Sequence, residues 1–255
     1  HRLRPAPRSS AVSRRLRRCL LAAGGLLALL ALLAAGLLWQ LNYNDGLDPQ
    51  ERTLSGDPAQ RLARGAYLAR IGNCIGCHTA RGGPPGAGGL PIATPFGTLY
   101  TSNLTPDDDT GLGRWPAGAF RRALLHGRSA DGRLLYPAFP YTHTTLLTPG
   151  DADALFTYFR SLPPTHARPP AHDLRWPYSS QAALAVWRAL YFRPGPLQPD
   201  PARPPDWNRG AYLVRAVAHC SACHAPRDSL GGADWGSLAG GLMAAQGWYA
   251  PSLLT

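Results

Sequence analysis

The chain has 255 residues, enough for one large domain or two small ones, and its formal net charge is +11 at pH 7. This charge does not indicate a nucleic-acid-binding protein, because residues 1–18 hold seven arginines and no acidic residue, which leaves 19 basic and 15 acidic residues elsewhere. Four of the five cysteines lie in two short motifs, a distribution that argues against a scaffold of disulfides.

A long uncharged segment follows the basic flank. Residues 19–39, CLLAAGGLLALLALLAAGLLW, would span about 31 Å as a helix, close to the hydrocarbon thickness of a bilayer. Positive flanks stay on the cytoplasmic side, so residues 1–45 are predicted to form a single-pass anchor in the inner (cytoplasmic) membrane, with the rest in the periplasm. A cleaved signal peptide is the alternative, although its apolar core is usually about 7–15 residues long. Cys19 stands at the wrong end of the run for a lipoprotein cysteine and is expected to pack in the membrane.

The polar stretch 41–58 is expected to be a tether, and a helical domain is predicted at residues 46–165. Residues 65–77 have helical character. The Gly- and Pro-rich stretch 82–113 is expected to be a long loop that wraps around something, since loops of this length are otherwise uncommon. Helices are predicted at 116–127, ended by Gly127, and at 151–164, with Asp151 as N-cap. Convincing strand alternation is absent.

A proline-rich linker is predicted at residues 166–206. Within it, residues 179–192 have apolar positions at helical spacing, and Pro194 ends this helix. The apolar positions are Ala182, Ala185, Val186 and Ala189. The helix is therefore expected to dock on one or both of the flanking domains.

The chain then repeats itself. RGAYLARIGNCIGCHTA at 64–80 matches RGAYLVRAVAHCSACHAP at 209–226, and 88–105 corresponds more faintly to 240–255. The 146 residues between His78 and His224 indicate duplicated domains rather than a solenoid. The first copy continues to about Leu162, so the second copy, at 207–255, is expected to be an incomplete domain without a counterpart of 106–162. The predicted fold class is mainly α, with tandem domains behind a transmembrane helix and the second domain truncated.

Each copy contains the pentapeptide C-x-x-C-H, which is the attachment signature of a c-type haem. On a helical turn, cysteines at i and i+3 share a face and can form thioethers to the two vinyl groups, while the following histidine lies beneath the iron. We therefore predict two covalently bound c haems with proximal ligands His78 and His224. The cofactor-binding residues are Cys74, Cys77, His78, Cys220, Cys223 and His224.

Two other roles of C-x-x-C pairs fit less well. A four-cysteine zinc site would not need duplicated flanking sequences around each pair. A thioredoxin-type dithiol needs a βαβ context, which is missing here.

The distal iron ligands are less constrained. The only methionine, Met243, lies in the second copy, so the first haem has no methionine ligand from its own domain, and the histidine candidates are His126 and His143. We favour His143, because prolines fix its segment, YPAFPYTHTT, and the aromatic residues could line the haem edge; an open site is the alternative. His126 is expected to have a surface or capping role, and Met243 to pack against the porphyrin or nearby apolar side chains.

The remaining histidines are not expected to ligate iron. His1 is terminal, and His166 and His172 lie in the linker. His219 stands directly before Cys220 and is expected to point to solvent. The counterpart of His143 for the second haem would fall beyond residue 255.

RGAYLARIGNCIGCHT, TPFGTLYTSNLTPDDDTGLGRW, LLYPAFPY and ALFTYFRSLPP resemble the cytochrome c subunits of bacterial membrane-bound dehydrogenases, and the resemblance covers about residues 60–255. That family includes subunits of alcohol, gluconate and aldehyde dehydrogenases and of molybdenum hydroxylases acting on nicotinate or isoquinoline. Members commonly carry three haem domains, which implies a third haem beyond the second copy. Phe139 stands where the flavin- and quinone-enzyme partners usually have an axial Met in YPAMPY. A His four residues further on is similar to the molybdenum-hydroxylase branch.

The resemblance implies an electron-transfer subunit rather than a catalytic one. A partner dehydrogenase with molybdenum and iron–sulfur centres would pass electrons through the haems to quinone, another cytochrome or a terminal oxidase. Replacing Met by His as ligand should lower the potential of the first haem. Two rivals stay open at this point: a dihaem peroxidase, which needs an open iron, and a cytochrome subunit of a haem–copper oxidase.

Overall fold

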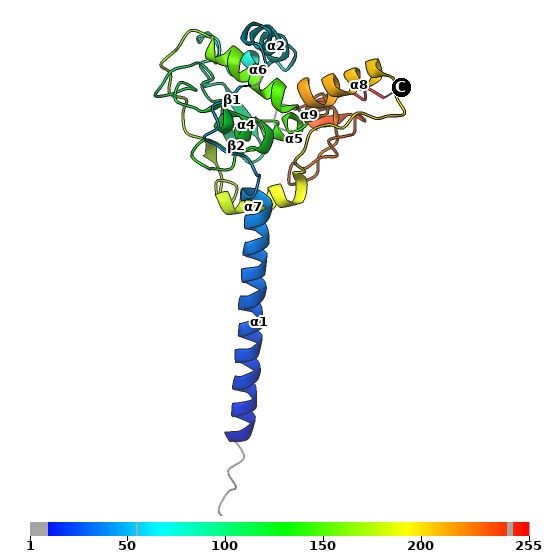
Figure 1. Ribbon diagram of the computed structural model, residues 1–255. Helices are drawn as coiled ribbons and strands as arrows, with labels where there is room; N and C mark the ends of the chain where they lie inside the picture. The colour runs from blue at the N-terminus through cyan, green and yellow to red at the C-terminus, as the bar shows by residue number, and fades with distance from the viewer. Residues whose placement is uncertain (1–9, 55, 244–246, 255) are drawn as a thin grey trace, which may run out of the picture. The chain divides into compact units, whose positions relative to one another are not determined.

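The structure is a computed structural model that describes residues 10–54, 56–243 and 247–254 (Figure 1). His1, the first three arginines of the basic flank and Thr255 lie outside the described residues. The chain divides into two compact units, His1–Asn44 and Asp45–Thr255, and each is described by itself. The regular structure is mainly helical, as predicted from the sequence.

The first unit is one helix, α1 (Ser10–Tyr43). An 18-residue window within its segment Arg14–Tyr43 has a mean hydropathy of 2.4, and most of its leucines are exposed, as they would be against lipid. The rings of Trp39 and Tyr43 stack at the end of the helix, with centroids 4.6 Å apart. The predicted anchor segment therefore forms a continuous helix that is long and apolar enough to cross a bilayer.

In the second unit, α2 (Pro58–Ile71), α4 (Ala117–His126) and α6 (Pro149–Arg160) surround the main apolar core. The ring of Phe120 on α4 lies 5.1 Å from that of Phe156 and 5.9 Å from that of Phe159, both on α6. Helix α4 ends before Gly127, whose φ of 59° fits the left-handed cap predicted for it.

The start of α6 differs from the prediction. The N-cap is Thr148, whose Oγ1 accepts a hydrogen bond from the N–H of Asp151 at 3.1 Å. The Asp151 carboxylate instead accepts two hydrogen bonds of 2.8 Å from the guanidinium of Arg64 on α2. The acidic residue thus ties the first turn of α6 to α2, and the hydroxyl three residues earlier caps the helix.

Helices α2 and α6 cross at Gly65. A Cβ added to Gly65 would lie 1.9 Å from the carbonyl oxygen of Ala154, so only glycine permits this approach. The two helices are the first and last helical segments of the first repeat. Gly65, the glycine of RGAYL, therefore allows the first and last helices of the first repeat to pack against each other.

A small antiparallel sheet interrupts the region expected to be loop. It consists of β1 (Pro91–Thr94), β2 (Gly97–Tyr100) and β3 (Asp173–Leu174), with Pro91 opposite Tyr100 and Thr98 opposite Asp173. The loop prediction for 82–113 is thus wrong at this hairpin. These strands are two to four residues long and mostly half-exposed, so they carry no alternation of apolar residues that a sequence could reveal.

Residues 45–54 pack against the first repeat. The N–H of Gly118 donates to the carbonyl of Glu51 at 2.7 Å, and the Asp45 carboxylate pairs with Arg128 at 2.7 Å. The tether predicted for 41–58 is therefore wrong at both ends, because residues 41–43 belong to α1 and the chain packs against the first repeat from Asp45 onward. The short helix α5 (Tyr141–Thr144) is buried in the same unit.

The linker helix α7 (Gln181–Tyr191) begins after Ser180, whose Oγ accepts from the N–H of Ala183 at 3.2 Å. It contacts both flanking segments, as predicted. The N–H of Leu134 donates to Oε1 of Gln181 at 2.8 Å, and the indole N–H of Trp187 donates to the carbonyl of Leu230 at 2.9 Å. The expected packing stripe is wrong, however, because Ala182 and Val186 are exposed.

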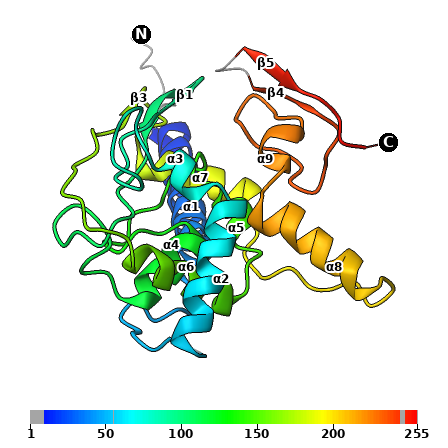
Figure 2. The same cartoon turned by 90° about the horizontal axis from the view of Figure 1, so that it is seen from above.

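The second repeat begins with α8 (Pro205–Tyr212), continues into the π-helical turn η1 (Leu213–Val217), and then forms α9 (Ser221–His224), β4 (Gly241–Met243) and β5 (Trp248–Ala250). Strands β4 and β5 form an antiparallel hairpin with Gly241 opposite Ala250. Figure 2 shows these elements together on one side of the second unit, with α2, α4 and α6 on the other. Gly210, the counterpart of Gly65, has no described atom within 4 Å of the position of an added Cβ.

Candidate haem-attachment sites

The first C-x-x-C-H motif lies on a single helical turn, α3 (Cys74–Cys77), directly after α2. Asn73 takes a left-handed conformation with φ 49° and turns the chain away from the axis of α2. The N–H of His78 donates to the carbonyl of Cys74 at 2.9 Å. Both thiols and the imidazole therefore belong to one turn, as haem attachment requires.

The second motif has the same local conformation. His219, in the position of Asn73, also has a left-handed backbone with φ 41°. The N–H of His224 donates to the carbonyl of Cys220 at 3.0 Å, and Cys220 directly precedes α9, which contains Cys223. Cys74, Cys77, Cys220 and Cys223 are all free of disulfide bonds.

The two motif histidines have matching ring partners. Nδ1 of His78 lies 2.7 Å from the carbonyl oxygen of Ser102, and Nδ1 of His224 lies 2.7 Å from that of Pro251. A carbonyl only accepts, so each ring carries its proton on Nδ1, and Nε2 is left with its lone pair. A hydrogen bond of this kind fixes the orientation of a metal-binding imidazole and strengthens it as a ligand.

A glycine holds each motif against its carbonyl partner. The N–H of Gly88 donates to the carbonyl of His78 at 2.8 Å, and the N–H of Gly240 donates to the carbonyl of His224 at 2.7 Å. Gly88 has φ 76°, and its added Cβ would lie 2.5 Å from the carbonyl carbon of Ser102. The chain after β2 therefore passes too close to Gly88 for any side chain at this position.

The donor set fits a covalent c haem. Each turn offers two thiols at i and i+3 that form no disulfide, and an imidazole whose Nδ1 is occupied by a carbonyl and whose Nε2 can ligate iron. Among the described residues, no group of three or more His, Cys, Asp or Glu side chains is placed to hold a metal ion, as a four-cysteine zinc site would require.

The thiols lie in a low-polarity environment. Burial, with a smaller effect of Cys77, raises the pKa of Cys74 to about 12. Burial also raises the pKa of Cys77, and the neighbouring Cys223 of the second motif adds to this effect. Burial likewise raises the pKa of Cys220. The raised pKa values keep these thiols in the protonated form at neutral pH when no group is attached to them.

The two motifs lie next to each other. Nε2 of His219 lies 3.3 Å from the carbonyl oxygen of Gly72, and an added Cβ on Gly72 would lie 3.1 Å from the carbonyl oxygen of Val217. The expectation that His219 points to solvent is therefore wrong. The backbone just before each cysteine pair contacts its counterpart, so both attachment turns belong to one packed assembly.

His143 is buried between the halves of this assembly, with 1% of its surface exposed. Its Nε2 lies 2.9 Å from Oγ of Ser221, inside the second motif, and its Nδ1 lies 3.1 Å from Oγ1 of Thr142. Its ring packs edge-on against Trp235 at 5.1 Å. Burial, then His219 and Arg227, lower the pKa of His143 to about 3. The structure thus places His143 beside the second motif; its role as an iron ligand stays a prediction.

Met243 and three further histidines make local contacts. His126 ends α4, and its carbonyl accepts a hydrogen bond of 2.8 Å from Arg188. Met243 ends β4, half-buried and opposite Trp248. Nδ1 of His166 lies 3.4 Å from Asp107, and Nδ1 of His172 accepts from the N–H of Tyr100 at 3.2 Å.

Some site residues are visible only in the fold. Ser102 and Pro251 act through backbone carbonyls, and the sequence could suggest them only through the faint match of 88–105 with 240–255. Ser221 is one of the variable residues of its motif, and its Oγ also donates to the carbonyl of Trp235 at 2.7 Å.

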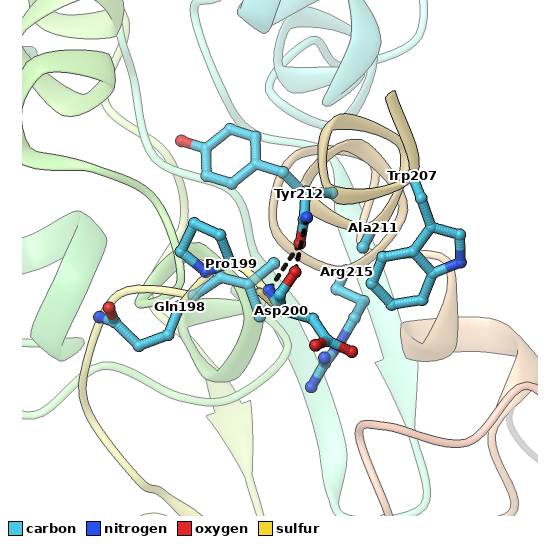
Figure 3. A pocket seen from close by; sticks show the side chains of 9 residues that line it. Gln198, Pro199, Asp200, Trp207, Ala211, Tyr212 and Arg215 are labelled. Atoms are coloured by element: carbon cyan, nitrogen blue, oxygen red, sulfur yellow. Dashed lines mark hydrogen bonds between the residues drawn. The ribbon is translucent and has the colours of Figure 1, made fainter. Parts of the chain in front are cut away.

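A separate hollow of about 180 Å³ lies between residues 197–200 and α8 (Figure 3). Asn208 joins its two sides: its Oδ1 accepts a hydrogen bond from the N–H of Asp200 at 2.7 Å, and its Nδ2 donates one to the carbonyl of Asp200 at 2.9 Å. Its lining contains no cysteine or histidine, and it is smaller than typical ligand pockets. This hollow is not part of the attachment sites.

No family profile matches the chain, but curated proteins do. The chain is 45% identical over 228 residues to a nicotinate dehydrogenase component of Pseudomonas putida, an alignment covering 89% of this chain and 19% of that protein. It is 43% identical over 169 residues to the gluconate 2-dehydrogenase cytochrome c subunit of Pantoea cypripedii, covering 65% of this chain and 38% of that protein.

A third relative is matched over most of its length. The diheme cytochrome c-type protein of Cereibacter sphaeroides is 34% identical over 223 residues, covering 84% of this chain and 73% of that protein. The chain spans less than half the length of the first two relatives. With two matched attachment turns and this extent of similarity, the chain belongs to the family of c-type cytochromes that includes this diheme cytochrome and the cytochrome c subunits of dehydrogenases.

Proposed function

We propose that this chain carries two covalently attached c haems in tandem cytochrome domains and transfers electrons from a partner dehydrogenase to the respiratory chain. The observation that carries the proposal is the duplicated histidine geometry, in which Nδ1 of His78 and of His224 each lies 2.7 Å from a backbone carbonyl beside two free thiols. The haem supplies the redox chemistry when bound, and the protein supplies attachment, ligation and burial.

The tandem-domain part of the proposal rests on matched local structure. Both copies have a left-handed residue before the first cysteine, a glycine N–H bonded to the motif histidine carbonyl, and a hairpin that follows the motif. The contact between His219 and Gly72 brings the two attachment turns together. Two redox groups in one packed assembly suit electron transfer rather than independent chemistry at each site.

The distal ligand proposed for the first haem is His143. It is buried, and a neutral imidazole is the form that binds iron. Ligation through Nε2 would require the ring to exchange its 2.9 Å contact with Ser221 for the metal. The proposal therefore ties occupation of the first haem to a rearrangement at the second motif.

The location and partners are proposed from the anchor and the relatives. Helix α1 would hold the protein in the cytoplasmic membrane, with the haem-binding unit in the periplasm. The relatives are named as subunits of nicotinate and gluconate dehydrogenases, which favours a dehydrogenase partner over the peroxidase and haem–copper oxidase alternatives. We place the partner in the molybdenum and iron–sulfur class and the acceptor among quinones, cytochromes or oxidases.

Counting haems tests the proposal. The full chain, expressed with a c-type haem attachment system, should contain two haems per protein by pyridine haemochrome absorbance. Replacing Cys74 and Cys77 by Ser should remove about half of the covalent haem, and replacing Cys220 and Cys223 should remove the other half. Cys19→Ser, outside both motifs, is the matched control and should retain both. Haem content that does not respond to either double substitution would refute the attachment sites.

A further inference from the structure

The linker helix α7 exposes an apolar stripe and buries a charge. Ala182, Val186 and Leu190 follow each other at i, i+4 and i+8 and face outward, with Val186 46% and Leu190 54% exposed. The inward side holds Leu184 and Arg188, which are 5% and 2% exposed. In an ordinary surface helix, the apolar stripe faces the domain and the charged side chains face water. In α7 an apolar stripe faces outward and the charged Arg188 is buried.

The flanks of α7 continue this surface. Trp176, 84% exposed, and Tyr178, 38% exposed, lie just before the helix, and Arg175 and Arg193 are exposed on either side. Residues 174–199 contain no acidic residue. Aliphatic side chains flanked by Trp, Tyr and Arg are typical of segments at the boundary between lipid headgroups and acyl chains.

The position of α7 in the chain indicates which surface it meets. Asp45 stands two residues after the end of α1, so at most about 7 Å of chain separates them. Within the second unit, Asp45 pairs with Arg128 at 2.7 Å, close to the end of α4. Arg188 on α7 donates to the carbonyl of His126 at that same helix end, at 2.8 Å. Asp45, the first residue of the second unit, and α7 therefore both contact the chain at the C-terminal end of α4.

We propose that the α7 stripe (Ala182, Val186 and Leu190, with Trp176) inserts into the headgroup region of the bilayer that α1 spans, with Arg175 and Arg193 directed at anionic lipids. This inference rests on the membrane anchoring in the proposed function. It gives the haem-binding unit a second membrane contact at the end of the unit opposite α2, where Figure 1 places α7. A bilayer fits this surface better than a protein partner, because it accepts a narrow apolar stripe with basic flanks and demands no shape complementarity.

Spin labelling of the full haem-loaded chain tests this contact. In a Cys19→Ser background, Val186→Cys and Leu190→Cys carry the label, while Leu62→Cys, on α2 and 39% exposed, is the matched control. A label at Leu29→Cys on α1 reports the anchor. The proteins are reconstituted in phosphatidylethanolamine–phosphatidylglycerol vesicles, and relaxation by oxygen, enriched in lipid, is compared with relaxation by a water-soluble nickel complex.

The ratio of oxygen to nickel accessibility should be several-fold higher at 186 and 190 than at 62, and should fall at both sites in neutral phosphatidylcholine vesicles. Equal ratios at 186, 190 and 62, with a lipid-like ratio at 29, would overturn the α7 contact while leaving the anchored cytochrome intact. Immobilised labels at 186 and 190 without oxygen enrichment would show a protein contact and also overturn it. A water-like ratio at 29 would refute the anchor, and the inference with it.

Discussion

Nε2 of His143 lies 2.9 Å from Oγ of Ser221, the residue directly after the first cysteine of the second C-x-x-C-H motif. The two residues are 78 positions apart, and both are buried. A side chain of the first repeat thus reaches into the attachment turn of the second. Substitutions at these two positions separate iron ligation from packing between the repeats.

If His143 ligates the first haem, His143→Ala should convert one of the two haems from low spin to high spin, and His143→Met should restore low spin at a higher potential, because methionine ligation raises the potential. Visible and EPR spectra report the spin state, and a redox titration gives the potentials. Ser221→Ala is the control: it removes the hydrogen-bond partner but should leave the first haem low spin. Unchanged spectra in His143→Ala would assign His143 to packing alone.

Acid should destabilise the fold through His143. Its folded pKa is about 3, whereas an unfolded histidine titrates near about 6.5, so below that pH the unfolded chain binds a proton that the folded chain does not. Stability is therefore fully present above about pH 6.5 and falls by up to about 1.4 kcal/mol per pH unit as pH drops toward 3. Denaturant titrations at several pH values should show this dependence of the unfolding free energy on pH. In His143→Gln the slope should be smaller by the contribution of one proton, about 1.4 kcal/mol per pH unit. An identical slope in the variant would contradict the conclusion that burial of His143 causes the loss of stability in acid.

The two RGAYL glycines should respond in opposite ways to an added methyl group. At Gly65 the new Cβ would lie 1.9 Å from the Ala154 carbonyl, so Gly65→Ala should destabilise the chain by about 1–3 kcal/mol through overpacking. At Gly210, where no described atom lies within 4 Å, Gly210→Ala should be neutral or stabilise by up to about 1 kcal/mol, because alanine favours the helix. Thermal unfolding followed by circular dichroism compares them, and equal shifts would contradict the observed crossing of α2 and α6.

The carbonyl partner of His78 can be displaced through Gly88. An added Cβ would lie 2.5 Å from the carbonyl carbon of Ser102, so Gly88→Ala should move the acceptor, weaken the Nδ1 hydrogen bond and raise the potential of the first haem. Gly89→Ala is a close control, since Gly89 also has positive φ but its nearest neighbour would be 3.7 Å away. A redox titration should show a shift only for Gly88→Ala. Equal potentials in the two variants would show that this carbonyl does not tune the ligand.

Much of the local structure followed from the sequence. The apolar run forms α1, Gly127 ends α4, and α7 lies within the predicted 179–192 segment. The hairpins did not follow, because their short, half-exposed strands have no periodic pattern. The predicted cap of α6 is three residues too late: Asp151 and Thr148 are both good caps, but Pro149 suits the first helical position after Thr148, and the Asp151 carboxylate pairs with Arg64.

The sequence by itself determined where the paired thiols and their imidazole lie, because C-x-x-C-H places two thiols and an imidazole on one turn whatever surrounds it. The tertiary structure alone decided that Ser102 and Pro251 orient the histidines, that His219 meets Gly72, and that the apolar side of α7 faces outward. Such contacts join residues far apart in the chain, and the exposed side of a helix depends on which neighbours cover it. Local periodicity carries neither kind of information.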